Sequence, residues 1–170
     1  MNHMEYQEAA NYWNNKDMDT VKMPRQEILE AMETYIKEDN TCALATGFGT
    51  FVRCTPIEYS YLEGSFYLFS EGGQKFVGLE HNDNVCLAIY NKYEGFGKVK
   101  GMQVSGKVNI IEPFSNEYNR VAAFKSIPLE ALKKLPHPMY LLKVRPERMD
   151  FLNSEFKELG YGSRQAIIFK

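Results

Sequence analysis

The chain has 170 residues, a mass of 19.7 kDa and a formal net charge of −2, which predicts one globular domain with a core of its own. The near balance of 20 basic and 22 acidic residues argues against nucleic acid as a partner, because binding to a phosphate backbone needs a basic excess. No apolar run is long enough to span a membrane and the first 16 residues are polar, so we expect a cytoplasmic protein without a membrane partner.

The chain opens with helical segments. Residues 1–22 are amide-rich and charged and carry the pair Tyr12-Trp13, so we expect an arm or a short helix that packs through its aromatic side chains. Pro24 then suits the first turn of a helix, and apolar residues between Ile28 and Ile36 recur at three- and four-residue spacing. This second helix is predicted to end near Asp39, and residues 1–170 are predicted to form a single domain.

After this helix the hydrophobic period changes to two, which is typical of strands. Strands are predicted over residues 42–46, 51–61, 65–69, 85–90 and 98–111, with a short helix over 74–81. Pro56 removes a backbone donor from the second strand, so this strand is expected at an edge, at a bulge or beside something other than a strand. Gly101 and Gly106 predict bends in the long strand.

The last third of the chain is predicted as two helices followed by strands. The helices cover residues 115–125 and 129–134, and the strands cover 139–144, 148–152 and 165–169. The aromatic share of 14% also favours a β-rich core. Together these features predict a mainly β protein, an antiparallel barrel with helices packed outside it, rather than a doubly wound sheet.

The cysteines and the common sequence motifs exclude several kinds of site. Cys42, Cys54 and Cys86 are widely spaced and lie in strand-like runs, so we expect small buried hydrophobic residues in a reducing compartment. The sequence has no zinc-type spacing of cysteines and histidines, no Walker motif and no dinucleotide fingerprint. We therefore predict no metal site, and no catalytic acid or base is identified.

The stretch SEGGQK, residues 70–75, lies between a predicted strand and a predicted helix. Its two glycines allow the backbone to approach a ligand, and the start of the helix offers free N–H groups to an anion. Lys75 falls in the first helical turn, where the helix dipole disfavours a cation unless an anion is bound nearby. The alternative interpretation is a Gly-Gly turn followed by a solvated lysine.

Arg53 lies in a strand between Val52 and Cys54, where an arginine needs a carboxylate, an exposed position or a ligand. If residues 51–61 pair with 65–69 across the turn at 63–64, Arg53 approaches the segment after Phe69. An arginine and a lysine would then converge beside one loop, as a phosphate site requires. The alternative is a surface ion pair of Arg53 with Glu58 or Glu71.

Five stretches of the chain, in this order and at this spacing, resemble the pyridoxamine 5'-phosphate oxidase-like, FMN-binding split-barrel family. They are TCALATG (41–47), VRCTPIEY (52–59), FYLFSEGGQKF (66–76), NDNVCLAI (82–89) and GMQVSGKV (101–108). The resemblance covers about residues 28–112 and implies an antiparallel split β-barrel, a homodimer and an FMN at the subunit interface.

The resemblance also implies which residues contact the cofactor. Arg53 and Lys75 would hold the FMN phosphate, with Ser70, Gly73 and Gln74 completing the phosphate loop. Thr55 would lie along the isoalloxazine ring, and Met102 and Gln103 would approach the ring from another side. Arg164, near the end of the chain, is a further residue that could reach the site of either subunit.

One departure from the family pattern bears on the activity. The oxidases of vitamin B6 metabolism carry a basic residue where this chain has Glu58, and a carboxylate repels a phosphorylated substrate. The resemblance therefore implies an FMN-dependent oxidoreductase acting on another small molecule. Left open are a non-catalytic flavin-binding or stress-response module, a barrel that binds heme or a deazaflavin, and a pure interaction protein. The scarcity of histidines, which commonly ligate heme iron, weakens the case for heme as the ligand.

Overall fold

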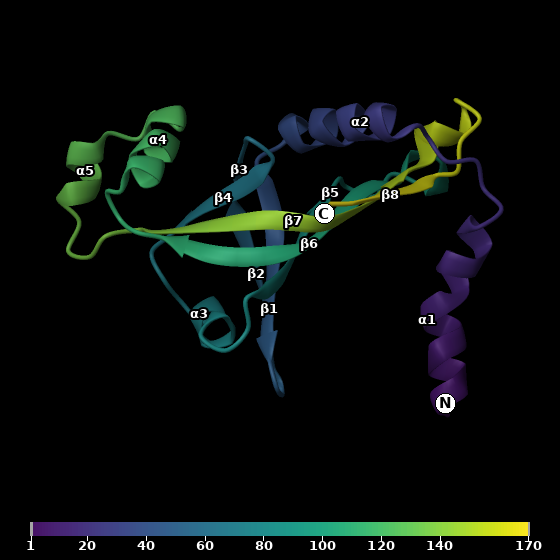
Figure 1. The fold of residues 1–170 in the computed structure, drawn as a ribbon, viewed down its shortest axis with the longest axis horizontal. Helices are drawn as coiled ribbons and strands as arrows, with labels where there is room; N and C mark the ends of the chain where they lie inside the picture. Colours follow the sequence, from purple (N-terminus) through teal and green to yellow (C-terminus); the bar gives the residue numbers. More distant parts are fainter. Residues whose placement is uncertain (1, 170) are drawn as a thin grey trace.

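A computed structural model describes residues 2–169, and its centre is one curled antiparallel sheet with helices around it (Figure 1). The strands are β1 (Thr41–Phe48), β2 (Phe51–Glu58), β3 (Ser60–Leu62), β4 (Ser65–Ser70), β5 (Asn84–Tyr90), β6 (Lys100–Ile111), β7 (Tyr140–Asn153) and β8 (Arg164–Ile168). The helices are α1 (His3–Asp17), α2 (Arg25–Glu38), α3 (Lys75–Leu79), α4 (Asn116–Phe124) and α5 (Leu129–Lys133). Short 3₁₀ turns cover Phe96–Lys98 and Ser154–Lys157.

The strand order β2-β1-β5-β6-β7-β4-β3, with β8 added to β7, makes neighbours of segments that are far apart in the sequence. All of these pairings are antiparallel, and the sheet curls on itself, so the predicted mainly β barrel with flanking helices is confirmed. Among the described helices, none combines the length and the apolar character that a membrane crossing requires.

The predicted strand over residues 51–61 is in fact two strands with different partners. β2 pairs along its whole length with β1, whereas β3 pairs with β4. The break falls at Tyr59, which is 3% exposed and whose hydroxyl donates to the Ile36 carbonyl at 2.7 Å. Anchoring of Tyr59 to α2 turns the chain from one side of the barrel to the other. β2 is an end strand of the sheet, which confirms the edge position that Pro56 predicted.

The two strands predicted over 139–144 and 148–152 are one continuous strand, β7, paired with β6. The register shifts between Ser105 and Gly106, where Gly106 lies opposite Pro146. The bulge lets the strand pass the proline, which cannot donate to the ladder. The bend predicted at Gly106 is confirmed, whereas Gly101 pairs regularly with Tyr90 and Leu152 and makes no bend.

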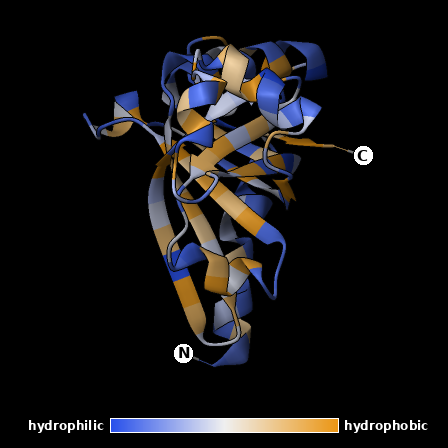
Figure 2. Cartoon of the chain, turned by 90° about the vertical axis from the view of Figure 1, so that its left-hand side faces the viewer, coloured by the Kyte–Doolittle hydropathy of each residue, from blue (hydrophilic) through white to orange (hydrophobic). Residues whose placement is uncertain are grey.

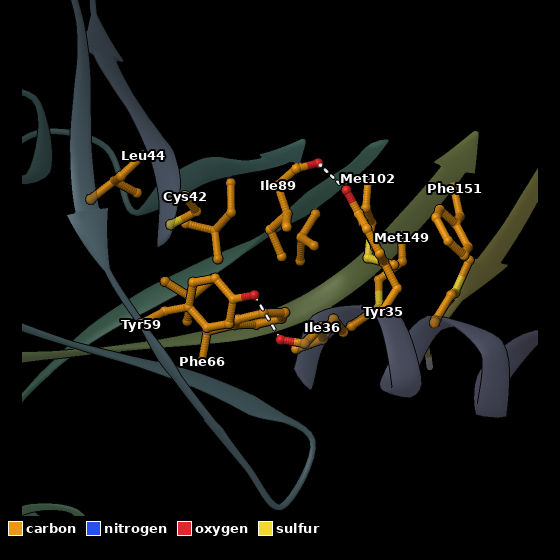
Figure 3. Close-up of a cluster of buried hydrophobic side chains, with 14 of the residues drawn as sticks. Tyr35, Ile36, Cys42, Leu44, Tyr59, Phe66, Ile89, Met102, Met149 and Phe151 are labelled. Atoms are coloured by element: carbon orange, nitrogen blue, oxygen red, sulfur yellow. Dashed lines mark hydrogen bonds between the residues drawn. The ribbon is translucent and has the colours of Figure 1, made fainter. Parts of the chain in front are cut away.

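The main core fills the space between α2 and the concave side of the sheet. Ile28, Met32, Tyr35 and Ile36 of α2 are 0–3% exposed. The helical spacing selected these four and also Leu29, which is only partly buried. Figure 3 shows Tyr35 and Ile36 facing the side chains of the strands, with Tyr35 stacked on Phe151 at 4.8 Å between ring centroids. A second, smaller cluster joins α4 and α5 to β4 and β7.

The opposite side of the sheet defines what we call the outer face. Alternation of buried and exposed residues assigns to it three residues of β1 (Ala43, Ala45, Gly47), three of β2 (Val52, Cys54, Pro56) and two of β5 (Cys86, Ala88). Cys54 is exposed and Cys86 is partly exposed, so the prediction of three buried cysteines holds only for Cys42. Period-two alternation sends Cys54 outward, opposite Ala45.

The N-terminal arm is a regular helix that stands off from the barrel (Figure 1). A capping box between Asn2 and Glu5 starts it, but none of its described residues is buried. Tyr12 is 53% exposed and Trp13 is 45% exposed. Figure 2 shows apolar residues running along the strands, in contrast to the mostly hydrophilic N-terminal segment.

Candidate cofactor site

The loop after β4 is a tight turn built on two glycines. Gly72 and Gly73 have φ values of 125° and 103°, a region that other residues rarely adopt. The Ser70 hydroxyl, 5% exposed, accepts from the Gly72 N–H at 3.1 Å and donates to the Gly72 carbonyl at 3.2 Å. Ser70 therefore holds the shape of the loop.

Lys75 begins α3 and is only 7% exposed. Its ammonium donates to the Gly72 carbonyl and lies 5.5 Å from the centre of the Phe76 ring. No carboxylate pairs with it among residues 2–169. Burial, and then the positive charge of Arg53, lower the pKa of Lys75 from its usual 10.5. A solvated lysine, the alternative interpretation, is therefore wrong.

Arg53 and Lys75 are neighbours, although the predicted pairing that would bring them together does not form. Arg53 lies opposite Thr46 of β1, and α3 packs on this end of β1 through Gly78. A Cβ at Gly78 would lie 3.0 Å from the Gly47 nitrogen and 3.2 Å from the Thr46 Cβ. The close approach of α3 to β1 thus places Lys75 where it interacts electrostatically with Arg53.

Neither of the surface ion pairs considered for Arg53 is present in the described part of the chain. Glu58 instead pairs with Lys125 at 2.8 Å and accepts from the Asn40 amide at 2.9 Å. Glu71 is exposed and makes no ion pair within residues 2–169. Arg53 itself is exposed, so its guanidinium is free to meet a ligand beside the buried ammonium.

The helix end contributes less to this site than the sequence suggested. α3 has five residues, and the N–H groups of Phe76 and Val77 already donate to the carbonyls of Gly73 and Gln74 at 3.1 Å. A helix this short has a small dipole, because few peptide units are aligned. An anion here would be held mainly by the two cationic side chains.

The structure brings together five of the eight predicted cofactor residues: Arg53, Ser70, Gly73, Gln74 and Lys75. Gly73 borders the ammonium, since a Cβ there would lie 3.7 Å from the Lys75 Nζ. Gln74 is exposed beside them, and Thr55 lies two residues from Arg53 on the same face of β2.

Met102 and Gln103 lie away from this group. Met102 is 2% exposed inside the main core, and Gln103 is on the outer side of β6, opposite Ala88 and Asp150. Both residues border a cavity of about 850 Å³ between α1 and the β5–β8 part of the sheet. The resemblance named Met102, Gln103 and Arg164, which all line this cavity, but no pattern in the sequence predicted the cavity itself. Of the aromatic pair Tyr12-Trp13, Trp13 is the residue that lines it. Among the described residues, no three side chains of the metal-binding types converge on a common point.

No protein-family profile matches the chain. A diaminopimelate epimerase of Legionella pneumophila is 31% identical over 108 residues, which are 58% of this chain and 38% of the enzyme. The chain spans only 33–38% of the length of the curated relatives it matches.

Solved structures match over much more of the chain. A FAD-binding protein from Mesorhizobium loti has a TM-score of 0.58 at 18% identity, covering 72% of this chain and 89% of that one. A putative pyridoxamine 5'-phosphate oxidase from Listeria innocua has a TM-score of 0.57 at 16% identity, and the match covers 73% of this chain and 97% of that one. The heme storage protein HutZ from Vibrio cholerae has a TM-score of 0.59 at 16% identity, and the match covers 69% of this chain and 89% of that one.

These structural matches establish the fold of the protein. The chain has the split β-barrel fold of the pyridoxamine 5'-phosphate oxidase-like proteins, as the sequence resemblance implied. Proteins of this fold include flavin binders and heme binders, so the fold leaves the ligand to be argued from the site.

Proposed function

We propose that the protein is a cytoplasmic FMN-binding flavoprotein that acts as an oxidoreductase on a small molecule. The observation that carries the proposal is the buried ammonium of Lys75, which faces another cation and no carboxylate within residues 2–169. Two like charges are unfavourable together unless an anion lies between them, and a phosphate group is such an anion. The FAD-binding protein of the same fold supports a flavin.

The residues present fit the phosphate end of FMN. Lys75 and Arg53 would bind the phosphate, and Gly73 leaves space beside the ammonium that a side chain would fill. Ser70 would keep the loop in this shape, while Gln74 and Thr55 lie at the border of the site. Bound FMN would supply hydride-transfer chemistry, and the protein would bind and orient it.

We further propose a homodimer formed through the outer face. This face consists of small residues together with exposed apolar residues, among them Val52, which is 80% exposed. Burial of such a surface against a second copy removes apolar area from water. A dimer would also explain why Gln103 lies apart from Lys75 in one chain, because Gln103 would approach the flavin bound to the other subunit.

Ala45→Glu is expected to convert the dimer into a monomer, because Ala45 lies in the middle of the outer face between Cys54 and Cys86. A carboxylate buried without a partner is strongly disfavoured. Light scattering coupled to gel filtration measures the mass. Phe124→Glu, at an apolar position of α4 that is 56% exposed, is the matched control and should stay dimeric. A dimeric Ala45→Glu protein would contradict this interface.

Addition of FMN to the purified protein is expected to give a bound-flavin absorption spectrum that gel filtration does not remove. A reduced pyridine nucleotide should then bleach the spectrum, and an oxidised substrate should restore it. A spectrum without bleaching under any substrate would favour the non-catalytic flavin-binding alternative. A protein that stays colourless with FMN would contradict the proposal.

Heme is the second candidate, because heme-binding proteins share the fold. The same spectra distinguish the two, since heme gives a Soret band. Of the three histidines, His81 is nearest to α3, and its ring packs on Phe48 at 4.4 Å. The similarity to diaminopimelate epimerases covers too little of those enzymes for their activity to be proposed here.

A further inference from the structure

One buried side chain beside the proposed phosphate site is left without a partner. Thr46, near the end of β1, is 4% exposed, and its hydroxyl oxygen makes no hydrogen bond within residues 2–169. The other such atom in this part of the chain, Oδ1 of Asn119, belongs to an amide whose nitrogen donates to the Phe114 carbonyl at 3.0 Å. A buried hydroxyl that bonds to nothing has lost its water without compensation, so its presence needs an explanation.

Thr46 lies where β2 and α3, the two elements that carry the cations, meet β1. Arg53 is its cross-strand partner, so the two side chains share a face of the sheet, and the Cβ atoms of such a pair are about 5 Å apart. On that face α3 packs closely, since a Cβ at Gly78 would lie 3.3 Å from the Thr46 Oγ1. Gly78 follows Lys75 by three residues, so both positions lie on the same side of the helix. The hydroxyl is therefore enclosed by the elements that form the site.

The hydrogen-bonding capacities of these groups indicate what could satisfy the hydroxyl. A threonine hydroxyl has one donor and two acceptor lone pairs, whereas ammonium and guanidinium groups only donate. The cations beside Thr46 can therefore serve its oxygen but not its hydrogen. The hydrogen needs an acceptor, and in the described part of the chain no side chain or backbone carbonyl provides one. An oxygen atom of a bound anion would be such an acceptor.

We propose that Thr46 is a further binding residue of the phosphate site, whose hydroxyl donates to one phosphate oxygen while Lys75 and Arg53 donate to the others. A phosphate monoester has three terminal oxygens, and the ammonium, the guanidinium and the hydroxyl provide a donor for each. The site would thereby select FMN over riboflavin, which has the same ring without the phosphate. This inference rests on the proposed function, to which it adds a specificity-determining residue.

Thr46→Val removes the hydroxyl and keeps the branched shape of the side chain. The full-length parent and variant are each titrated with FMN and with riboflavin, and binding is followed by flavin fluorescence. The FMN affinity is expected to fall about tenfold, which corresponds to about 1.4 kcal/mol, because a hydrogen bond to a charged group is lost. Riboflavin affinity should not change, and Thr46→Ser, which retains the hydroxyl, should keep most of the FMN affinity. Parental FMN affinity in Thr46→Val would overturn the proposal.

Urea unfolding without any ligand separates this role from a structural one. Because the hydroxyl bonds to nothing in the free protein, Thr46→Val is expected to unfold at a urea concentration equal to or above that of the parent. A lower midpoint, together with equal losses of FMN and riboflavin affinity, would show a structural role and overturn the proposal. Thr34→Val is the matched control and should change neither flavin affinity, because Thr34 is exposed on α2 and its hydroxyl donates to the Glu30 carbonyl at 2.8 Å.

Inorganic phosphate, added during thermal unfolding, separates this inference from the proposed function. If the parent prefers FMN to riboflavin and only Lys75→Met loses that preference, the assignment of Thr46 fails and the proposed function stands. If phosphate raises the unfolding temperature of the parent more than that of Thr46→Val but FMN never binds, the assignment of Thr46 stands and the flavin fails. If the parent neither prefers FMN nor responds to phosphate, the phosphate site itself is wrong and both fail.

Discussion

Replacement of Lys75 by methionine is expected to weaken FMN binding strongly and, at the same time, to stabilise the protein without its cofactor. The ammonium would make charge-assisted hydrogen bonds to the phosphate, and their loss costs about 1.5–3 kcal/mol, or roughly tenfold to a hundredfold in affinity. Without FMN, methionine removes a desolvated charge that faces Arg53. The Gly72 carbonyl keeps a donor, since Ser70 also bonds to it.

The stability gain of Lys75→Met is expected to be of order 1 kcal/mol at neutral pH, measured by urea unfolding without FMN. It should shrink as the pH rises. The pKa of Lys75 is lowered in the folded state, so the folded protein releases this proton before the unfolded chain does. The cost of the buried charge is therefore present below the folded-state pKa and is relieved as the pH approaches 10.5, the ordinary lysine value.

Arg53→Ala is the second test of the phosphate site, and Lys133→Met is the control for both variants. Arg53→Ala should weaken FMN binding but leave a protein that folds normally, because Arg53 is exposed. Lys133 lies on the surface of α5 and pairs with Glu130 at 2.8 Å, so Lys133→Met should change neither FMN affinity nor pH dependence. Parental FMN affinity in both Lys75→Met and Arg53→Ala would show that the phosphate binds elsewhere, even if the protein is a flavoprotein.

Gly106→Ala is expected to destabilise the fold by about 3 kcal/mol, measured by urea or thermal unfolding. A Cβ at this position would lie 2.2 Å from the Arg145 carbonyl oxygen and 3.1 Å from the Pro146 Cα. Both obstacles are backbone atoms, so the methyl group cannot be accommodated by a change of rotamer. The two longest strands of the sheet would have to separate at their bulge.

Gly101→Ala is the matched control in the same strand. A Cβ there would lie 3.5 Å from the Ile89 carbonyl oxygen, which is an ordinary contact. Its stability should stay within about 1 kcal/mol of the parent, because alanine restricts the unfolded chain more than glycine does. Equal unfolding midpoints for the two variants would contradict the close approach of β6 to β7 at Gly106.

Local patterns in the sequence predicted the helices and most strands because these depend on the spacing of neighbouring residues. Apolar spacing in α2 selected Ile28, Met32 and Ile36, and all three are in the core. From backbone chemistry alone, Pro56 predicted an edge, a bulge or a neighbour other than a strand, and Gly106 predicted a bend; the structure has β2 at an edge and a bulge at Gly106. The predictions failed where a contact with a residue distant in the sequence sets the local structure. At Tyr59, the hydrogen bond to Ile36 divides one predicted strand into two.

The sequence by itself determined a β-rich barrel, the glycine turn after β4 and two cations as candidates for a phosphate, because composition, period and backbone freedom are properties of the chain. Only the tertiary structure decided that Lys75 is buried, that α3 rather than a β2–β4 pairing brings it to Arg53, and that Gln103 lies on the opposite face. Burial and proximity are set by strand order and helix packing, which join residues that no local pattern relates.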